Sequence, residues 1–252
     1  MGNLYLIFLG LIQGLCEFLP VSSSGHLVLF SSLFGIADSL LVSIILHVAT
    51  LFAVVVVYFE DVKDWVLHPF SNKAMLIYIA TIPTCLIVLV LMPLVNASFN
   101  GKYLFICFLI SAILLFVVDL YAKGKHSKKF GVKNAIIMGI AQGIAVFPGI
   151  SRSGTTISAG LISGADKKEC AKFSFLMSIP IIVMSMLLEV YEIIKGRQVV
   201  NVNFVGLILG FLVAFFVGIL SIKAMIKITK KLQFKWFSIY LVIISIVCII
   251  LL

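Results

Sequence analysis

Long apolar blocks, separated by short polar segments, run along most of the chain. Six of them are long enough, or nearly so, to cross a bilayer as helices, which takes about 20 residues each. Aromatic residues near the ends of these blocks are typical of the membrane interface. The pattern therefore predicts an all-α, polytopic membrane protein with six transmembrane helices, at residues 39–59, 74–95, 103–122, 173–195, 204–222 and 236–252.

Two further apolar regions are each interrupted by a polar, Gly/Ser-rich break, one at residues 19–26 and the other at 148–154. The flanking arms would be about 14–23 Å long as helices, whereas the hydrocarbon core is about 30 Å thick. Proline in the break ends a helix, and such backbone is tolerated at membrane depth only inside protein or along a wet cavity. We expect two re-entrant helical hairpins, and kinks in ordinary spans are the plainer alternative. The arms are residues 4–18 and 27–36, then 135–147 and 155–163.

The two breaks repeat each other at a fixed distance of 129 positions (142 − 13 and 151 − 22). The same shift carries the three spans of the first half approximately onto those of the second half. We therefore expect a single membrane domain, 1–252, built from two repeats at about 1–122 and 130–252. The matching pairs are Gln13 and Gln142, Gly14 and Gly143, Phe18 and Phe147, Ser22 and Ser151, Ser24 and Ser153, and Gly25 and Gly154.

Charge gives the expected orientation. Charged residues are 12% of the chain, and the net charge is +9. The lysines gather in segments 123–134, 166–172 and 223–235, which should be cytoplasmic. Both ends of the second hairpin are then inside and both ends of the first are outside, so the repeats are inverted and their tips should meet near the midplane. Since no basic face carries interleaved aromatics, we expect no nucleic-acid partner.

The residues in the breaks favour an oxyanion ligand, most simply phosphate. Glycine lets backbone N–H groups approach a ligand, and a following helix N-terminus points more N–H groups at it. Arg152 adds a charged fork that matches phosphate oxygens, and a charge at membrane depth is functional by default. A structural ion pair with Glu17 is the alternative role for Arg152. The expected phosphate-binding residues are Ser22, Ser24, Gly25, Ser151, Ser153 and Gly154.

Glu17 lies one turn beyond Gln13, so both side chains share a helix face. A carboxylate beside a phosphate is repelled unless a cation or a proton lies between them. We therefore expect a divalent cation, Mg²⁺ or Ca²⁺, held by Glu17 with help from the Gln13 carbonyl. Substrate phosphates and water would complete the coordination. Glu17 acting as a general base is the main rival.

His26 follows the glycine of the first break and is a candidate catalytic residue. It could attack phosphorus or donate a proton to a leaving group. Ser23 is a second candidate nucleophile, with His26 as its base, and the sequence does not choose between them. A cavity-facing role and simple packing explain His47 equally well. Asp119 and Glu189 lie near span ends, where solvated side chains need no special role.

At these residues the sequence resembles the bacterial undecaprenyl-diphosphatase family, known also for bacitracin resistance. One family signature, (Glu/Gln)-x-x-x-Glu followed by Pro-x-Ser-Ser-x-Gly-His, reads here from Gln13 to His26. The other, Pro-Gly-x-Ser-Arg-Ser-Gly, reads from Pro148 to Gly154, and the resemblance covers essentially the whole chain. Gln13 stands at the first acidic position of the family, and glutamine cannot serve as an anionic ligand or base. By motif position, the resemblance implies that the functional residues are Glu17, Ser23, His26 and Arg152.

The resemblance also implies an enzyme that hydrolyses undecaprenyl diphosphate to the monophosphate and inorganic phosphate with a divalent cation. This reaction recycles the lipid carrier for cell-wall glycans. The expected location is the bacterial cytoplasmic membrane, with the active site opening toward its outer face. The expected partners are the polyprenyl diphosphate and membrane lipids, and a homodimer is left open. A secondary transporter or lipid flippase is the alternative function, because inverted repeats with broken helices are typical of transporters.

Overall fold

The computed structural model describes residues 2–34, 40–122, 129–196 and 203–252. Within these ranges the chain forms eleven α-helices and no strand, which confirms the all-α prediction. Several predicted features lie outside the described residues: Ser39, Ile36, and three lysines of the first basic segment, Lys123, Lys125 and Lys128. The helices are α1 (Asn3–Cys16), α2 (Ser23–Phe34), α3 (Leu40–Val57), α4 (Phe59–Leu67), α5 (Asn72–Ser98), α6 (Leu104–Tyr121), α7 (Val132–Ile144), α8 (Arg152–Ile162), α9 (Lys167–Ile194), α10 (Phe204–Lys231) and α11 (Lys235–Leu251).

Six of the helices coincide with the six apolar blocks: α3, α5, α6, α9, α10 and α11. Among the described residues, α5, α6, α9 and α10 are long and apolar enough to cross a membrane, and α3 with α4 forms a bent pair that would make a fifth span. α11 is apolar but has 17 residues. α10 continues past the predicted end at Ile222 to Lys231, because lysine favours a helix nearly as well as leucine does. These helices make the chain a multi-pass membrane protein.

The short helix α4 was not predicted. The chain turns by 89° after Tyr58, between α3 and α4. α4 is too polar to be found as a span, and acidic side chains in its first turn favour its N-terminus. An ion pair of 2.6 Å between Asp61 and Lys172 ties α4 to α9, and the Trp65 indole donates to the Tyr78 hydroxyl of α5 at 2.9 Å.

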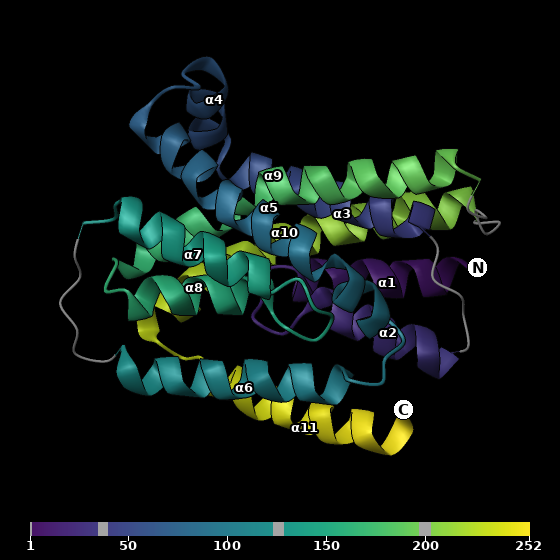
Figure 1. Cartoon of the computed structure of the whole chain (residues 1–252). Coiled ribbons are helices and arrows are strands. Elements are labelled where there is room, and N and C mark those ends of the chain that lie inside the picture. Colours follow the sequence, from purple (N-terminus) through teal and green to yellow (C-terminus); the bar gives the residue numbers. More distant parts are fainter. Residues whose placement is uncertain (1, 35–39, 123–128, 197–202) are drawn as a thin grey trace.

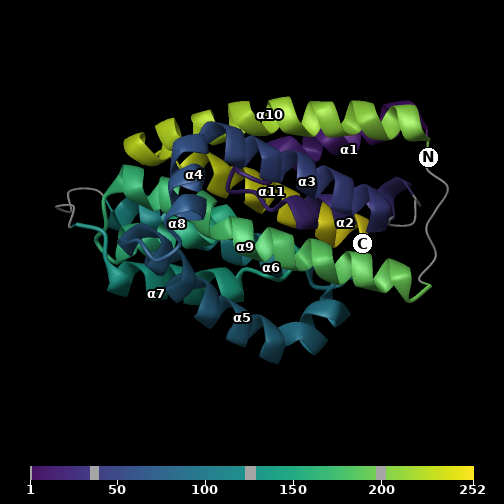
Figure 2. The same ribbon diagram turned by 90° about the horizontal axis from the view of Figure 1, so that it is seen from above.

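Two helix pairs enter the molecule from opposite ends, α1–α2 from the end that carries both termini and α7–α8 from the other (Figure 1). The loop between α1 and α2 (residues 17–22, the first tip) and the loop between α7 and α8 (residues 145–151, the second tip) meet in the middle. α1 packs on α10 and α7 packs on α5, while α3 contacts α9 and α6 contacts α11. Figure 2 shows α10 and α5 on opposite sides of the molecule, with α3 and α9 between them.

Glycines allow the hairpin helices to lie very close to their neighbours. A Cβ on Gly10 of α1 would collide with the carbonyl oxygen of Gly210 in α10. A Cβ on Gly139 of α7 would collide in the same way with the carbonyl oxygen of Ala80 in α5. Small residues at helix contacts are a common means of close packing inside membranes. The same packing solution is therefore used once in each half.

Asp119 has a structural role that the sequence did not reveal. Its carboxylate is buried and accepts the backbone N–H groups of Phe234 at 3.0 Å and Lys235 at 2.8 Å. The first residues of α11 have no side-chain cap of their own, so Asp119 of α6 caps this helix from outside. The expectation that Asp119 needs no special role was wrong, because its capping partners lie more than 100 positions away.

Candidate active site

The two tips contact each other through backbone and serine groups. The Gly149 N–H of the second tip donates to the Ser22 hydroxyl at 3.1 Å. Just after the second tip, the Ser153 hydroxyl donates to the Leu19 carbonyl of the first tip at 3.1 Å. Two segments far apart in the sequence therefore form one polar centre between apolar helices.

The Glu17 carboxylate lies at this centre and is 6% exposed. One of its oxygens, Oε2, accepts the Ser23 hydroxyl at 2.6 Å and the Gln13 side-chain amide at 3.1 Å. The other oxygen, Oε1, pairs with the Arg152 guanidinium. A buried charge needs such partners, since an unpaired carboxylate is very costly away from water. The structure thus brings the side chains of Gln13, Ser23 and Arg152 together around Glu17.

Ser23 and Arg152 are repeat partners, because they lie 129 positions apart. Each is the first residue of a helix, Ser23 of α2 and Arg152 of α8, and each contacts the same carboxylate of Glu17. The two helix N-termini therefore converge on one point. The partial positive charge and free N–H groups of a helix N-terminus favour anions there. This arrangement can bind a carboxylate and, beside it, a phosphate.

Ser22 bends the first tip. Its φ of +69° is uncommon for a residue other than glycine, and such conformations persist only where surrounding contacts fix them. Two contacts fix it here, since the Ser22 hydroxyl accepts the N–H groups of Gly25 at 3.3 Å and of Gly149 at 3.1 Å. Its repeat partner Ser151 has an ordinary φ of −75° and caps α8. The first tip is therefore the more distorted of the two.

The second tip follows the same serine pattern in a regular cap. The Ser151 hydroxyl accepts the Gly154 N–H at 3.1 Å, and the Ser153 hydroxyl lies 3.4 Å from that of Ser151. The hydroxyls of Ser22 and Ser24 in the first half are also 3.4 Å apart. All six predicted phosphate-binding residues thus lie where the tips meet. Their hydroxyl and N–H groups are hydrogen-bonded to the tips themselves, and phosphate binding stays a prediction.

His26 is buried beside the centre and bonds to the first tip rather than to the Glu17 carboxylate. One ring nitrogen, Nδ1, lies 2.8 Å from the Ser22 carbonyl, which can only accept, so Nδ1 carries the proton. The other, Nε2, lies 2.7 Å from the Tyr240 hydroxyl, and the two rings stack at 5.7 Å. The hydroxyl of Ser23 donates to Glu17 instead of to His26. The geometry therefore supports Glu17, and not His26, as the group that could take the Ser23 proton.

Gln13 and Glu17 can be tested as ligands for a divalent cation. The Gln13 carbonyl oxygen is buried and has no hydrogen-bond partner among the described residues. The amide donates its N–H to Glu17, so it must rotate before the Gln13 carbonyl and the Glu17 carboxylate can bind one Mg²⁺ or Ca²⁺, a cation that accepts both kinds of oxygen. No group of three His, Cys, Asp or Glu residues that could hold a metal occurs in the described part of the chain. The two residues fit a cation only if other oxygens complete its coordination.

A second polar cluster lies between α3 and α9. The Ser43 hydroxyl donates to Glu189 at 3.1 Å, and His47 Nδ1 lies 2.9 Å from the Ser43 carbonyl. From the sequence, a cavity-facing role and simple packing explained His47 equally well, and Glu189 was expected to need no special role. The sequence signal for this cluster was an acidic residue and a histidine within apolar helices, because ionisable residues at membrane depth are functional candidates by default.

The sequence matches a known protein family over nearly its whole length. The family model described as bacitracin resistance protein BacA matches residues 6–247. The chain belongs to the BacA family. The resemblance stated from the two motifs is therefore confirmed, and every residue of the tips lies within the part that matches BacA.

Curated members of the BacA family align over nearly their full length. The undecaprenyl-diphosphatase of Bacteroides fragilis is 39% identical over 256 residues, covering 97% of this chain and 96% of the relative. The undecaprenyl-diphosphatase of Carboxydothermus hydrogenoformans is 36% identical and covers 100% of this chain and 98% of the relative. That of Caldicellulosiruptor bescii is 40% identical over 245 residues, 93% of this chain and 91% of the relative.

Proposed function

We propose that the protein is an integral membrane phosphatase that hydrolyses undecaprenyl diphosphate to undecaprenyl phosphate and inorganic phosphate. It would thereby recycle the lipid carrier for cell-wall glycan synthesis and give resistance to bacitracin. The names of the BacA relatives support this reaction class. The observation that carries the proposal is the Glu17 carboxylate held between Ser23 and Arg152 at two converging helix N-termini.

Ser23 is the nucleophile that this geometry favours. Its hydroxyl already donates to Glu17 at 2.6 Å, a charge-assisted distance, so the proton has an acceptor. Attack of the Ser23 oxygen on the terminal phosphorus breaks the bond to the bridging oxygen, and undecaprenyl phosphate leaves with the proton from Glu17. Water then attacks the phosphoserine, Glu17 takes a proton from that water and returns it to the serine oxygen, and inorganic phosphate leaves.

Arg152 and the surrounding N–H groups would stabilise the charge on the transferred phosphoryl group. Its side chain is 19% exposed, and only one of its nitrogens is paired with Glu17. The remaining guanidinium N–H groups are available to phosphate oxygens. Preorganised donors of this kind are the main source of catalysis in phosphoryl transfer. The ion pair and the phosphate-binding role of Arg152 are thus compatible.

His26 would be a positioning residue that holds the first tip in place. Its Nδ1–H bond to the Ser22 carbonyl and its contact with Tyr240 hold the bent first tip, which in turn places Ser23 at the start of α2. A direct attack by His26 on phosphorus would first require loss of one of these bonds. We keep phosphohistidine as the second mechanism, to be separated from phosphoserine by experiment.

A divalent cation, Mg²⁺ or Ca²⁺, would be held by Glu17 and the Gln13 carbonyl, together with substrate phosphates and water. When bound, such a cation supplies positive charge that offsets the repulsion between the carboxylate and the diphosphate. The unpartnered Gln13 carbonyl oxygen supports this assignment. Because Gln13 is uncharged, Glu17 is the anionic ligand in this pair.

The finer architecture that fits this function is an inverted repeat of one re-entrant hairpin and three spans. Its support is that equivalent residues make equivalent contacts: Gly10 with Gly210 of α10, and Gly139 with Ala80 of α5. With the lysine-rich ends of α9 and α10 in the cytoplasm, the first hairpin enters from outside. The active site would then open toward the outer face of the bacterial cytoplasmic membrane.

Phosphate release separates this proposal from transport. The purified protein, supplied with undecaprenyl diphosphate and Mg²⁺ or Ca²⁺, should release inorganic phosphate. Replacing Arg152 with Ala should lower that rate by about 10³-fold, as loss of a charge-stabilising arginine does in phosphoryl transfer. Absence of release by the wild-type protein, together with movement of intact lipid between leaflets, would instead support the transporter or flippase.

A further inference from the structure

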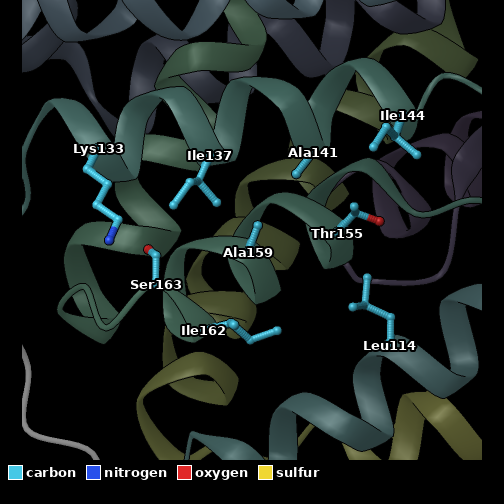
Figure 3. Close-up of a pocket in the computed structure, with 9 residues that line it drawn as sticks. All are labelled: Leu114, Lys133, Ile137, Ala141, Ile144, Thr155, Ala159, Ile162 and Ser163. Atoms are coloured by element: carbon cyan, nitrogen blue, oxygen red, sulfur yellow. The ribbon is translucent and has the colours of Figure 1, made fainter.

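An apolar groove of about 550 Å³ lies between α6, α7 and α8. Its walls include Leu114 of α6, Ile137 and Ile144 of α7, and Ala159 of α8. Figure 3 shows these side chains pointing into the space between the helices. A groove lined in this way suits a hydrocarbon chain rather than a polar ligand.

The first repeat carries larger side chains at the positions equivalent to those that line the groove. At the equivalent place in the first hairpin, three rings fill the space between α1 and α2. Phe8 packs on Phe30 with ring centres 5.0 Å apart, and Phe34 lies 6.2 Å from Phe8 and 6.3 Å from Phe30. The residues 129 positions later are Ile137, Ala159 and Ser163. Loss of the three rings opens the groove in the half that carries Arg152.

One end of the groove lies next to the active site. Thr155, which lines that end, follows Arg152 by three residues and so lies about one turn away on the same side of α8. Ile144 at the same end is the last residue of α7 before the second tip. The Thr155 hydroxyl is buried and lacks a hydrogen-bond partner among the described residues. A buried hydroxyl without a partner is uncommon in folded proteins, and the hydroxyl is free to bond a group of another molecule that reaches it.

We propose that this groove holds the prenyl chain of the diphosphate substrate next to its phosphate-bearing end. A rotation of the Thr155 side chain then brings its buried hydroxyl to the phosphate group attached to the chain, one turn from Arg152. The inference rests on the proposed function, because it takes the chain of that same substrate. Lys133 and Ser163 lie at the opposite end, where a phospholipid could enter with its headgroup on the Lys133 amine. The polar, unpartnered threonine at the active-site end favours the substrate chain.

Filling the groove should reduce activity in a way that depends on chain length. Ala159→Phe and Ile137→Phe place rings where the first repeat has Phe30 and Phe8. For these variants, kcat/KM for undecaprenyl diphosphate should fall by about tenfold or more. For geranyl diphosphate, whose chain is much shorter, it should change far less. Ile136→Phe adds the same ring at an exposed neighbouring position outside the groove and should change either value by no more than about twofold.

A labelling experiment gives a readout that does not need turnover. Ala159→Cys, reacted with a lipid-soluble maleimide above the background of the native cysteines, should be protected by undecaprenyl phosphate. An equal concentration of phosphatidylglycerol should protect it less. If phosphatidylglycerol protects equally well and Lys133→Gln removes that protection, the groove is a phospholipid site and the proposal is overturned.

The outcomes also separate this inference from the proposed function. If the wild type hydrolyses neither diphosphate, the proposed function fails. If the wild type hydrolyses both and the groove variants lower both rates equally, the function stands and the chain site is wrong. If only undecaprenyl diphosphate is hydrolysed, the labelling result decides.

Discussion

Glu17 receives hydrogen bonds and an ion pair from three helices: from Gln13 of α1, Ser23 of α2 and Arg152 of α8. Such a buried pair contributes little net stability, because the cost of removing two charges from water offsets much of their attraction. Loss of one partner is different, since the other charge is then buried without compensation. The pair is therefore better explained by the chemistry of the site than by the stability of the fold.

This distinction can be measured with a double variant. Arg152→Gln should lower the free energy of unfolding by about 3–5 kcal/mol, because it leaves the buried Glu17 charge unpaired. Glu17→Gln should lower it by less, because the Arg152 side chain is 19% exposed. The variant with both changes should recover most of the larger loss, while phosphate release stays about 10³-fold or more below that of the wild type in all three. Thermal unfolding in detergent and the phosphate assay give the two readouts. Recovery of activity in the double variant would mean that the pair is only structural.

At the scale of helices, close approach by glycine fixes how each hairpin is held. α1 lies on α10 and α7 on α5, with a glycine of the hairpin against a backbone carbonyl in each case. Such contacts bring backbones together through packing, which is the main source of helix association inside a membrane. The two tips meet only if the backbone of each hairpin lies this close to its neighbouring helix. The helix contacts therefore set the geometry of the active site from a distance.

Adding one methyl group at these contacts should have the same effect in both halves. Gly10→Ala and Gly139→Ala should each destabilise the protein by about 1–3 kcal/mol, because the new Cβ collides with a carbonyl oxygen of the neighbouring helix. Gly131→Ser is the control: an added Cβ there meets nothing within 4 Å, and serine is at least as good an N-cap as glycine. Thermal unfolding measures all three. A large loss at only one of the two glycines would contradict their equivalence.

At the scale of the whole molecule, the proposed inverted repeat predicts which loops face which side of the membrane. The loop around Asn100, between α5 and α6, should be outside, and the end of α10 at Lys231 should be inside. Asn100→Cys should react with a membrane-impermeant thiol reagent applied to intact cells, and Lys231→Cys should react only after the membrane is opened. Labelling is measured against the native cysteines. The reverse pattern would place the active site on the cytoplasmic face.

Much of the fold and of the site was predictable, for one physical reason. Membrane burial requires long apolar helices, so the polar breaks stand out, and the shift of 129 positions shows that they are equivalent. We expected the two breaks to meet as equivalent points of an inverted repeat, and the structure brings Glu17 to Arg152. That pair was foreseen as an alternative role for Arg152, and the structure contains it.

The remaining features depend on contacts that leave no pattern in the sequence. Tyr240, which pairs with His26, lies 214 positions away from it in an ordinary apolar block. The capping of α11 by Asp119 and the bond from Ser43 to Glu189 are likewise set by tertiary packing alone. The distorted backbone of Ser22 could not be foreseen either, because its repeat partner is regular.

In the proposed reaction Ser23, held by Glu17 opposite Arg152, attacks the terminal phosphorus. The most direct test is to mix the protein with undecaprenyl diphosphate labelled at the terminal phosphate and to stop the reaction within one turnover. Peptide mass spectrometry, under conditions that preserve phosphohistidine, then locates the label. We expect a phosphoserine at Ser23 that is lost in Ser23→Ala and Glu17→Gln but still forms in Tyr240→Phe. Phosphate on His26, or rapid hydrolysis by Ser23→Ala, would contradict it.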